Sequence, residues 1–358
     1  MNWRSATLDD VIELRRGFDL PSSERVPGAF PVVSAGKLNG THHEAMVEGP
    51  GFAVGRATNL GKPQWSETDF WPLNTTLYAT DFKGNNPKWL YHLFETLDLA
   101  GFDSGSVQPM LNRNYIKHVP VLVPPRGVQD AISEVIGALD DKIAANRQVI
   151  EVGDQLIRGL VRRTPTTRLP LVEAFTFKFG EAFKGEHFSE PGTGRPLIRI
   201  RDLKSFRCKV WTKEIRRNEI IAEPGTLLVG MDAEFRATRW AGPAALVNQR
   251  VMKVSSAKYG NAVAMVALEG PLSLIERSKV ATTVIHLNKS DLATETVAVP
   301  LDDWVAVVRS TVDPLYDRSV AASLEIDSLA RTRDELLPIL MNGRITVKDA
   351  EQAAEAVL

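Results

Sequence analysis

Two arginines near the middle of the chain carry the clearest potential for binding chemistry. Arg199 and Arg201 are two residues apart, so a β-strand through this segment would point both guanidinium groups to one face. Such a pair suits contacts with phosphates or with the acceptor edge of guanine. Residues 184–217 hold ten basic and four acidic side chains, whereas residues 301–358 hold six basic and eleven acidic ones. The positive charge is therefore local, in a chain whose net charge is −1.

Other basic and polar side chains of this kind lie in turn-rich segments. Glycines in these segments would let a loop approach a groove closely. Asn112 is able either to read a base edge or to cap a turn, and both roles stay open. The residues predicted to contact a nucleic acid are Lys37, His42, Arg56, Lys62, Asn112, Arg113, Arg199, Arg201, Lys204, Arg236, Arg239 and Arg250.

Sequence motifs for catalysis or metal binding are absent. The chain has no His-Glu-x-x-His or Cys-x-x-Cys spacing, no Gly-x-Ser-x-Gly elbow and no phosphate-binding Gly-Lys-Ser/Thr loop. Of the six histidines only His42 and His43 are adjacent, and the single cysteine, Cys208, excludes an internal disulfide. We therefore predict no catalytic and no metal-binding residue, and expect a binding protein rather than an enzyme.

Length and composition set the broad class of protein. A chain of 358 residues with 44% hydrophobic and 24% charged residues fits two or three globular domains. Its N-terminus lacks an apolar signal core, and its apolar runs are far shorter than the roughly 18 residues of a membrane span. We expect a cytoplasmic protein without membrane contact.

The sequence is faintly duplicated. Three blocks match at offsets that change only between blocks, as loop insertions in two copies of one domain would produce. The matches are 31–38 with 196–203 (offset 165), 48–56 with 222–230 (offset 174) and 111–116 with 287–292 (offset 176). Each copy begins with short apolar runs separated by Gly, Pro and Asn, which indicates a strand-rich domain.

Each copy ends in a long helical pattern. Over 132–160 and 305–340, seam residues step alternately by four and three, which is typical of a coiled coil. Two such stripes in matching places favour helices that pack on each other, the first about 50 Å long at about 1.5 Å per residue. Asn146 is a polar seam residue of the kind that fixes register. Pro314 predicts a kink or a restart in the second helix.

Several motifs, in order, resemble the target-recognition domain of type I restriction-modification specificity subunits. They are Gly51-Phe52-Ala53-Val54-Gly55-Arg56, Gly61, Phe70-Trp71-Pro72, Asn74-Thr75-Thr76-Leu77-Tyr78, Gly105-Ser106-Val107-Gln108-Pro109-Met110-Leu111-Asn112, and Val123-Pro124-Pro125 with Gln129. Residues 336–345 are similar to the close of the second conserved helix in that family. The resemblance covers essentially the whole chain and is closer up to about residue 160 than over 165–300.

The resemblance implies an α+β fold with a pseudo-twofold internal repeat. Two mixed target-recognition domains with β-rich cores would be joined by two long antiparallel coiled-coil helices. The predicted parts are target-recognition domain 1 (1–126), spacer helix 1 (127–164), target-recognition domain 2 (165–300), spacer helix 2 (301–343) and a C-terminal tail (344–358).

The resemblance also implies a function, namely reading a bipartite, asymmetric site on double-stranded DNA for phage defence. Lys37, Arg56, Lys62 and Arg113 would serve one half-site, and the basic residues from Arg199 onward the other. Reading from one side of the duplex favours half-site centres about 10 base pairs apart. The expected partners are two methyltransferase subunits, which modify adenine, and restriction/translocase subunits. S-adenosylmethionine and ATP would bind to those partners, so no cofactor is expected here.

The second copy departs from the family pattern. Val305 stands where the first copy has Gln129, and neither a Pro-Pro pair nor a Phe-Trp-Pro block is present. Three alternatives stay open: a scaffold whose two β-rich modules bind proteins, the specificity subunit of another DNA-modifying defence system, or an enzyme. An adjacent adenine-methyltransferase gene would favour the type I specificity subunit over these alternatives. Hydrolytic or transferase activity of the purified chain would favour an enzyme.

Overall fold

The computed structural model describes residues 3–99, 101–102, 110–232, 234–279 and 285–358. The chain divides into two compact units: unit 1 comprises Met1–Lys142 and Ser328–Leu358, and unit 2 comprises Ile143–Asp327. The residues Gly105-Ser106-Val107-Gln108-Pro109, which carry part of the family resemblance, lie outside the described residues.

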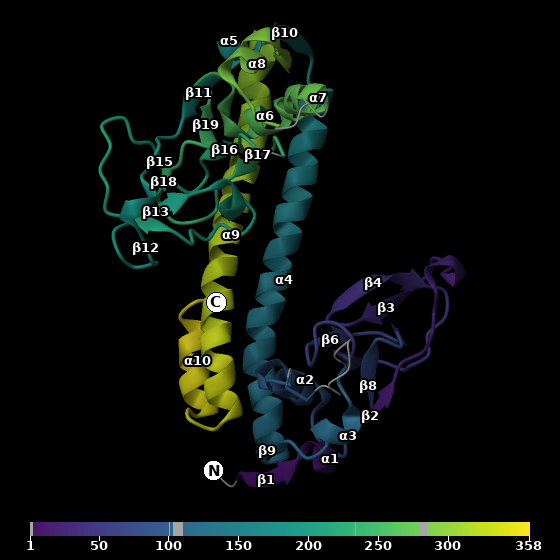
Figure 1. Cartoon of the computed structure of the whole chain (residues 1–358). Coiled ribbons are helices and arrows are strands. Elements are labelled where there is room, and N and C mark those ends of the chain that lie inside the picture. The colour runs from purple at the N-terminus through teal and green to yellow at the C-terminus, as the bar shows by residue number, and fades with distance from the viewer. Residues whose placement is uncertain (1–2, 100, 103–109, 233, 280–284) are drawn as a thin grey trace. The chain divides into compact units, whose positions relative to one another are not determined.

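Two long helices belong to both units. Helix α4 (Arg126–Arg163) begins in unit 1 and ends in unit 2, and helix α9 (Asp302–Met341) begins in unit 2 and ends in unit 1 (Figure 1). Within each unit their segments therefore run in opposite directions. None of the helices in the described part of the chain is both long and apolar enough to cross a bilayer.

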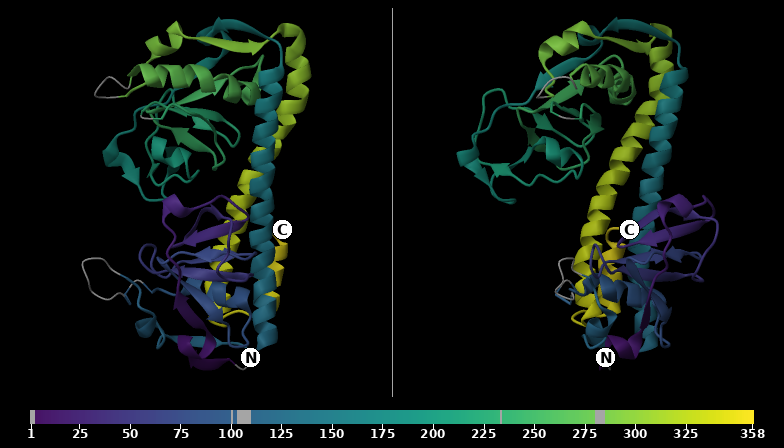
Figure 2. Two further views of the ribbon diagram at one scale, coloured as in Figure 1. Left: turned by 90° about the vertical axis from the view of Figure 1, so that its right-hand side faces the viewer. Right: turned by 45° about the vertical axis from the view of Figure 1, so that its right-hand side comes forward.

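Unit 1 contains a four-stranded antiparallel sheet of order β2-β8-β5-β6, a three-stranded sheet of order β4-β3-β7 and the pair β1-β9. Its strands are β1 (Arg4–Thr7), β2 (Glu13–Arg16), β3 (Phe30–Ser34), β4 (Lys37–His42), β5 (Gly51–Gly55), β6 (Pro63–Ser66), β7 (Trp71–Pro72), β8 (Thr76–Asp81) and β9 (Pro120–Val123). Its shorter helices are α1 (Leu8–Val11), η1 (Ser22–Glu24), α2 (Pro87–Thr96), α3 (Arg113–Ile116) and α10 (Val347–Glu355), the last beside the end of α9 (Figures 1 and 2).

Helix α2 covers the four-stranded sheet and is tied to the start of α4. Asn86 caps α2 by accepting hydrogen bonds from the N–H groups of Lys88 and Trp89. The buried Gln129 of α4 accepts from Asn86 N at 2.9 Å and donates to Asn85 Oδ1 and to the Pro124 carbonyl. Gln129 thus holds the beginning of α4 against unit 1, because each of its polar groups has a buried partner.

Unit 2 repeats this plan. Its sheets have the orders β11-β19-β16-β17, β12-β14-β13-β18-β15 and β10-β20. The strands are β10 (Thr166–Pro170), β11 (Thr176–Phe179), β12 (Phe188–Ser189), β13 (Arg195–Ile198), β14 (Trp211–Thr212), β15 (Ile221–Ala222), β16 (Leu227–Gly230), β17 (Ala237–Arg239), β18 (Ala245–Val247), β19 (Val251–Ser255) and β20 (Thr296–Pro300). The helices are α5 (Leu171–Ala174), η2 (Gly185–His187), η3 (Ile200–Leu203), α6 (Gly260–Ala267), α7 (Glu269–Lys279) and α8 (Lys289–Thr294).

Equivalent hydrogen bonds confirm the internal repeat. Leu111 N donates to the Arg56 carbonyl at 2.8 Å, and in unit 2 Leu287 N donates to the Met231 carbonyl at the same distance. The pair β10-β20 repeats β1-β9, and β11-β19-β16-β17 repeats β2-β8-β5-β6. Met231 is therefore the counterpart of Arg56, at an offset of 175. The predicted match of 48–56 with 222–230, which paired Arg56 with Gly230, is wrong by one residue.

The halves of α4 and α9 in unit 2 lie side by side (Figure 2). Gly153 faces Ser319, and a Cβ atom at Gly153 would lie 3.0 Å from Ser319 Oγ. The core of unit 2 is formed by β16 and β19 together with Val312 and Tyr316 of α9. Small residues thus allow the helices to approach closely where the coiled-coil seam was predicted.

Two details of the helices differ from the sequence patterns. Helix α9 continues through Pro314, so the restart that was one of the two predicted outcomes does not occur, and Asp313 forms an ion pair with Arg309 at 2.8 Å within the helix. Val312 and Tyr316 are buried in the core of unit 2, so packing on both sides of Pro314 stabilises the helix despite the lost N–H. Leu160 is exposed and Val161 is buried in its place, because a 3.6-residue turn drifts against a seven-residue repeat.

Replacing Gly137 or Gly159 with alanine is expected to raise the free energy of unfolding by about 0.5–1 kcal/mol, because alanine loses less backbone entropy in a helix. A Cβ atom at either position meets nothing within 4 Å. Gly153→Ala is the matched control and should give no gain, because its Cβ atom would crowd Ser319. Denaturant unfolding of the three variants checks this, and a gain for Gly153→Ala equal to the others would contradict the close approach of the helices.

Candidate nucleic-acid interface

Two arginines meet at one end of the four-stranded sheet of unit 1. Arg16 is the last residue of β2 and Arg56 follows the last residue of β5, with β8 between the two strands. Arg16 pairs with Leu77, which pairs with Val54, and Arg56 lies two residues beyond Val54. Because directly paired residues and residues two apart share a face, both arginines lie on the same side of the sheet.

The loop after β5 brings two lysines close to Arg56. It is closed by hydrogen bonds from Gly61 N to the Gly55 carbonyl and from Gly55 N to the Lys62 carbonyl, each 2.9 Å. The β3–β4 turn packs against this loop, since a Cβ atom at Gly36 would lie 3.4 Å from Lys62 Cβ. Lys37 follows Gly36 directly, so the backbone brings Lys37 and Lys62 to the same place, where both are exposed.

A third segment adds Asn112 and Arg113. The hydrogen bond from Leu111 to the Arg56 carbonyl docks this segment, and Arg113 Nη1 reaches the Leu14 carbonyl of β2 at 3.4 Å. The Asn112 side chain accepts from Asn114 N and caps α3, which is one of the two roles predicted for it. Asn112 thus positions the exposed Arg113 beside β2, next to Leu14.

We name Arg16, Lys37, Arg56, Lys62 and Arg113 the cationic cluster. Arg56 has no ion-pair partner within the described parts of the chain, and Arg16 reaches Asp19 only at 3.9 Å, with both side chains more than half exposed. Burial, and then the charge of Arg16, lower the pKa of the Arg56 guanidinium below its ordinary value. Like charges held together, with Asp19 reached only at 3.9 Å, favour binding of an anion or another acceptor-rich ligand.

The predicted residues of unit 2 surround the equivalent end of its sheet. Helix η3 packs on β16, because a Cβ atom at Gly230 would lie 3.4 Å from Ile200 Cγ2. Arg199 caps η3 and is half buried, whereas Arg201 and Lys204 are exposed. Arg236 is exposed in the segment between β16 and β17, and Lys204 pairs with Glu234 at 3.2 Å on the surface.

The strand predicted through Arg199 and Arg201 is wrong. Strand β13 ends at Ile198, and η3 follows. The buried carboxylate of Asp202 accepts a hydrogen bond from Arg199 N at 2.9 Å, which turns the chain out of the extended conformation. The two guanidinium groups therefore do not share the face of a strand.

Arg250 lies in a mixed group of charges instead of a purely cationic one. His286 Nδ1 is 2.6 Å from Asp232 Oδ1, and Arg250 Nη1 is 3.5 Å from the same oxygen. Arg250 Nη1 lies at 3.0 and 3.2 Å from the two ring nitrogens of His286, so the guanidinium lies over the imidazole face. This group offers both acceptors and donors, unlike the cationic cluster.

Arg239 points away from this surface. Its side chain is 8% exposed, its Nη1 is 2.9 Å from Asp154 Oδ1 of α4, and its guanidinium lies 5.1 Å from the Tyr316 ring of α9. The prediction that Arg239 contacts a nucleic acid is wrong, because the group is already used to hold β17 against the two helices.

Arg239→Met is expected to lower the free energy of unfolding of unit 2 by about 3 kcal/mol, because the variant leaves Asp154 part-buried without its cation. When only the folded fraction of each protein is compared, the affinity of the variant for DNA should stay within twofold of that of the wild type. Hydrogen exchange in unit 2 and a binding titration test both points. If the variant shows unchanged hydrogen exchange but weaker DNA binding, Arg239 would instead belong to the nucleic-acid interface.

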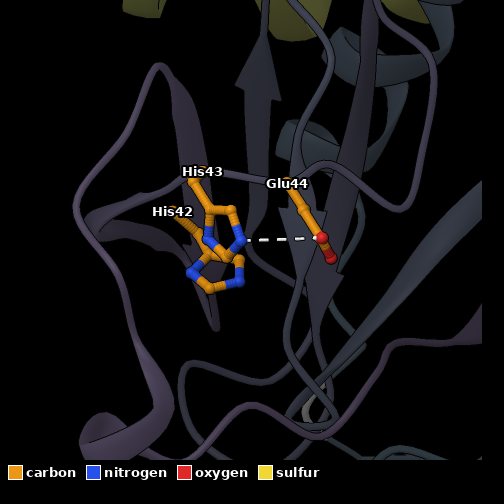
Figure 3. A group of neighbouring side chains, drawn as sticks. All are labelled: His42, His43 and Glu44. Atoms are coloured by element: carbon orange, nitrogen blue, oxygen red, sulfur yellow. Dashed lines mark ion pairs between the residues drawn. The ribbon is translucent and has the colours of Figure 1, made fainter.

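His42 also lies away from the cationic cluster. It ends β4, whereas Lys37 begins it, and it is buried with its ring against Trp71. His42, His43 and Glu44 place one ligand atom each within 4.8 Å of one another (Figure 3). However, His42 Nδ1 accepts a hydrogen bond from Val26 N at 3.1 Å. In neutral His42 the remaining ring nitrogen carries the proton, so only His43 and Glu44 offer free lone pairs, which is too few to fit a metal site.

Cys208 is poorly suited to act as a nucleophile. Burial, followed by the nearby charge of Asp202, raises the pKa of its thiol to about 12. At neutral pH the group is therefore a thiol and not the reactive thiolate.

Sequence reasoning missed Arg16, Asp232 and His286. Arg16-Gly17 in unit 1 matches Phe179-Gly180 in unit 2. A Cβ atom at Gly17 would lie 2.3 Å from the Leu73 carbonyl oxygen, and one at Gly180 would lie 2.3 Å from the Asn248 carbonyl oxygen. The repeat detected from sequence began only at residue 31. Extending it back to the Arg16-Gly17 match would have brought Arg16 into view. Asp232 and His286 are 54 residues apart and meet through a β-bridge, for which no local pattern exists.

Comparison with known proteins gives one consistent family. Residues 1–152 match the profile described as "Type I restriction modification DNA specificity domain". The type I restriction enzyme EcoBI specificity subunit of Escherichia coli is 31% identical over 209 residues, which are 56% of this chain and 44% of that protein. A putative type I restriction enzyme specificity subunit of Haemophilus influenzae is 26% identical over 141 residues, 37% of this chain and 36% of that protein. Each match thus spans less than half of the curated relative.

The fold has a solved counterpart along almost its whole length. The crystal structure of the S subunit of a type I restriction-modification system from M. genitalium superposes with a TM-score of 0.67 at 16% identity, covering 95% of this chain and 96% of that one. This coverage of 95% takes in parts of both β-rich units and both long helices of this chain. Residues 1–152 thus match the type I restriction-modification DNA specificity domain, and the chain as a whole shares the fold of a solved S subunit.

Proposed function

We propose that the protein is the DNA-recognition subunit of a type I restriction-modification complex and reads a bipartite site on double-stranded DNA. The observation that carries this proposal is the placement of basic side chains at the equivalent sheet end of both units. In unit 1 these form the cationic cluster, and in unit 2 they include Arg201, Arg236 and Arg250. Each unit would read one half-site, with some cations contacting phosphates and a minority contacting base edges.

The two half-sites would be read with different chemistry. The cationic cluster of unit 1 itself consists of donors, whereas the Asp232 carboxylate in unit 2 is able to accept from an amino group of cytosine or adenine. An asymmetric DNA site follows from this difference. Because α4 and α9 each pass from one unit into the other, we propose that their length sets the gap between the half-sites.

Catalysis would lie on partner subunits. Adenine methylation, with its S-adenosylmethionine, would belong to two modification subunits, and ATP-driven restriction to further subunits, with no cofactor on this chain. An exposed apolar stripe on α4 supports a helical partner: its residues are Val149, Val152, Leu156 and Leu160, between 37% and 49% exposed and three or four residues apart. The assembled complex would act on DNA in the cytoplasm.

Sequencing of methylated adenines in the genome of the source organism tests this function. With the gene intact, methylated adenines should occur in one bipartite motif, and deletion of this gene alone should remove methylation from that motif. A methylation pattern that survives the deletion would contradict the proposal.

A further inference from the structure

We infer that Arg56, supported by Arg16, reads a guanine in the half-site contacted by unit 1. The inference rests on the proposed function and deepens it, because it assigns a base to named side chains. Arg56 is half buried at the end of the sheet, between the Lys62 loop and the Leu111–Arg113 segment. Its backbone is fixed on both sides, since Arg56 N donates to the Thr75 carbonyl at 2.8 Å and its own carbonyl accepts from Leu111 N.

The internal repeat shows that the fold does not require arginine at these positions. The counterpart of Arg56 is Met231, and the counterpart of Arg16 is Phe179. Lys289 lies over the Phe179 ring at 5.0 Å, so unit 2 fills this place with an apolar contact and one cation. The packing of this fold therefore does not by itself require arginine at either position.

The two guanidinium groups have unused donors. Arg56 has no ion-pair partner among the described residues, and Arg16 has only the distant Asp19. A guanidinium presents a rigid fork of donors and no acceptor, which matches the N7 and O6 acceptors of guanine in the major groove. The half-buried Arg56, with its backbone fixed, is better suited to a fixed base edge than the exposed Lys37 and Lys62, which suit phosphates. Arg16 would orient Arg56 by repulsion and contact the same base pair or its neighbour.

The test uses the full chain, isolated with whatever subunits remain bound to it. The preferred double-stranded sequence is first selected from a random library, and each guanine of the half-site assigned to unit 1 is then replaced by 7-deazaguanine, which lacks the N7 acceptor. At one position, 7-deazaguanine should lower the affinity of the wild type about 10- to 100-fold. The same 7-deazaguanine should lower the affinity of the Arg56→Lys variant by less than about threefold. Arg56→Lys keeps the charge, so its affinity for unrelated DNA should not change.

Arg15→Lys is the matched control. Arg15 neighbours Arg16 on the opposite face of β2 and pairs with Glu13 at 2.9 Å, so the Arg15 variant should bind as the wild type does, whereas Arg16→Lys should weaken binding at the same half-site. The inference is overturned if that half-site contains no guanine, or if Arg56→Lys weakens binding to all DNA equally, as a phosphate contact would. If the wild-type chain selects no DNA sequence, it is the proposed function that fails, so the two failures can be told apart.

Discussion

Replacement of Arg333 with methionine is expected to destabilise unit 1 by about 3–5 kcal/mol, a large part of the total stability of a domain. Arg333 Nη2 lies 2.6 Å from Glu95 Oε1 of α2, and its Nε lies 2.8 Å from Asp140 Oδ1 of α4. The side chains of Arg333, Glu95 and Asp140 are 16%, 19% and 31% exposed. Arg333 thus joins the last part of α9 to α2 and α4 within unit 1.

The cost arises from the carboxylates that remain. Burial favours the neutral form of Glu95, but hydrogen bonds from His92 and Arg333 outweigh it and hold the pKa of Glu95 below its ordinary value. Burial raises the pKa of Asp140, although Arg333 opposes this shift. Without Arg333, two part-buried carboxyl groups lose the cation that pairs with both, and folding must overcome their desolvation and their repulsion.

Hydrogen exchange in each unit, together with denaturant unfolding, measures this effect. Arg344→Met, an exposed arginine of the same unit, is the control and should change stability by less than about 0.5 kcal/mol. Adding Glu95→Gln to the Arg333 variant should recover part of the loss, because one unpaired charge is removed. A loss below about 1 kcal/mol, or an equal loss of protection in unit 2, would contradict the role of Arg333.

Removal of four charges of the cationic cluster is expected to weaken DNA binding by at least about 100-fold near 0.1 M salt. The variant is Lys37→Gln, Arg56→Gln, Lys62→Gln and Arg113→Gln. Each phosphate contact releases counterions, so the slope of log affinity against log salt should shrink by about 0.9 for every contact that is lost. Binding titrations between about 50 and 200 mM salt give both quantities.

A control with the same change in net charge replaces cations elsewhere in unit 1, namely Arg4, Lys83, Arg344 and Lys348. Lys83 follows the opposite end of β8 from the cationic cluster. This control should keep the wild-type salt slope. If both quadruple variants weaken binding equally, overall charge and not the cluster governs affinity.

The sequence predicted the architecture well, because periodicity and repeats are properties of residue order. The two helices, the strand-rich halves and their duplication follow from seam residues and repeated blocks. Pro314 misled the prediction, because burial of Val312 and Tyr316 outweighs the missing hydrogen bond. The four-stranded sheets could not be ordered from sequence, since strand order depends on contacts between segments far apart in the chain.

The interface was predicted by residue type and only partly by position. Arg56, Lys62 and Arg113 meet as expected, because glycine-containing loops and an asparagine cap fix their segments. Arg239 was assigned to the interface from its charge alone, and only the structure shows that Asp154 already neutralises it. His42 is likewise buried and so excluded from the interface, and no local sequence pattern around it indicated this burial.

Selection of DNA from a random double-stranded library tests the central claim most directly, that each unit reads one half of a bipartite site. We expect the wild-type chain to select two conserved blocks separated by a fixed gap. The variant with Arg201→Ala and Arg236→Ala should select the same gap and one unchanged block, while the other block loses its preference. If both blocks lose preference together, or if the wild type selects one continuous block, the assignment of one half-site to each unit is contradicted.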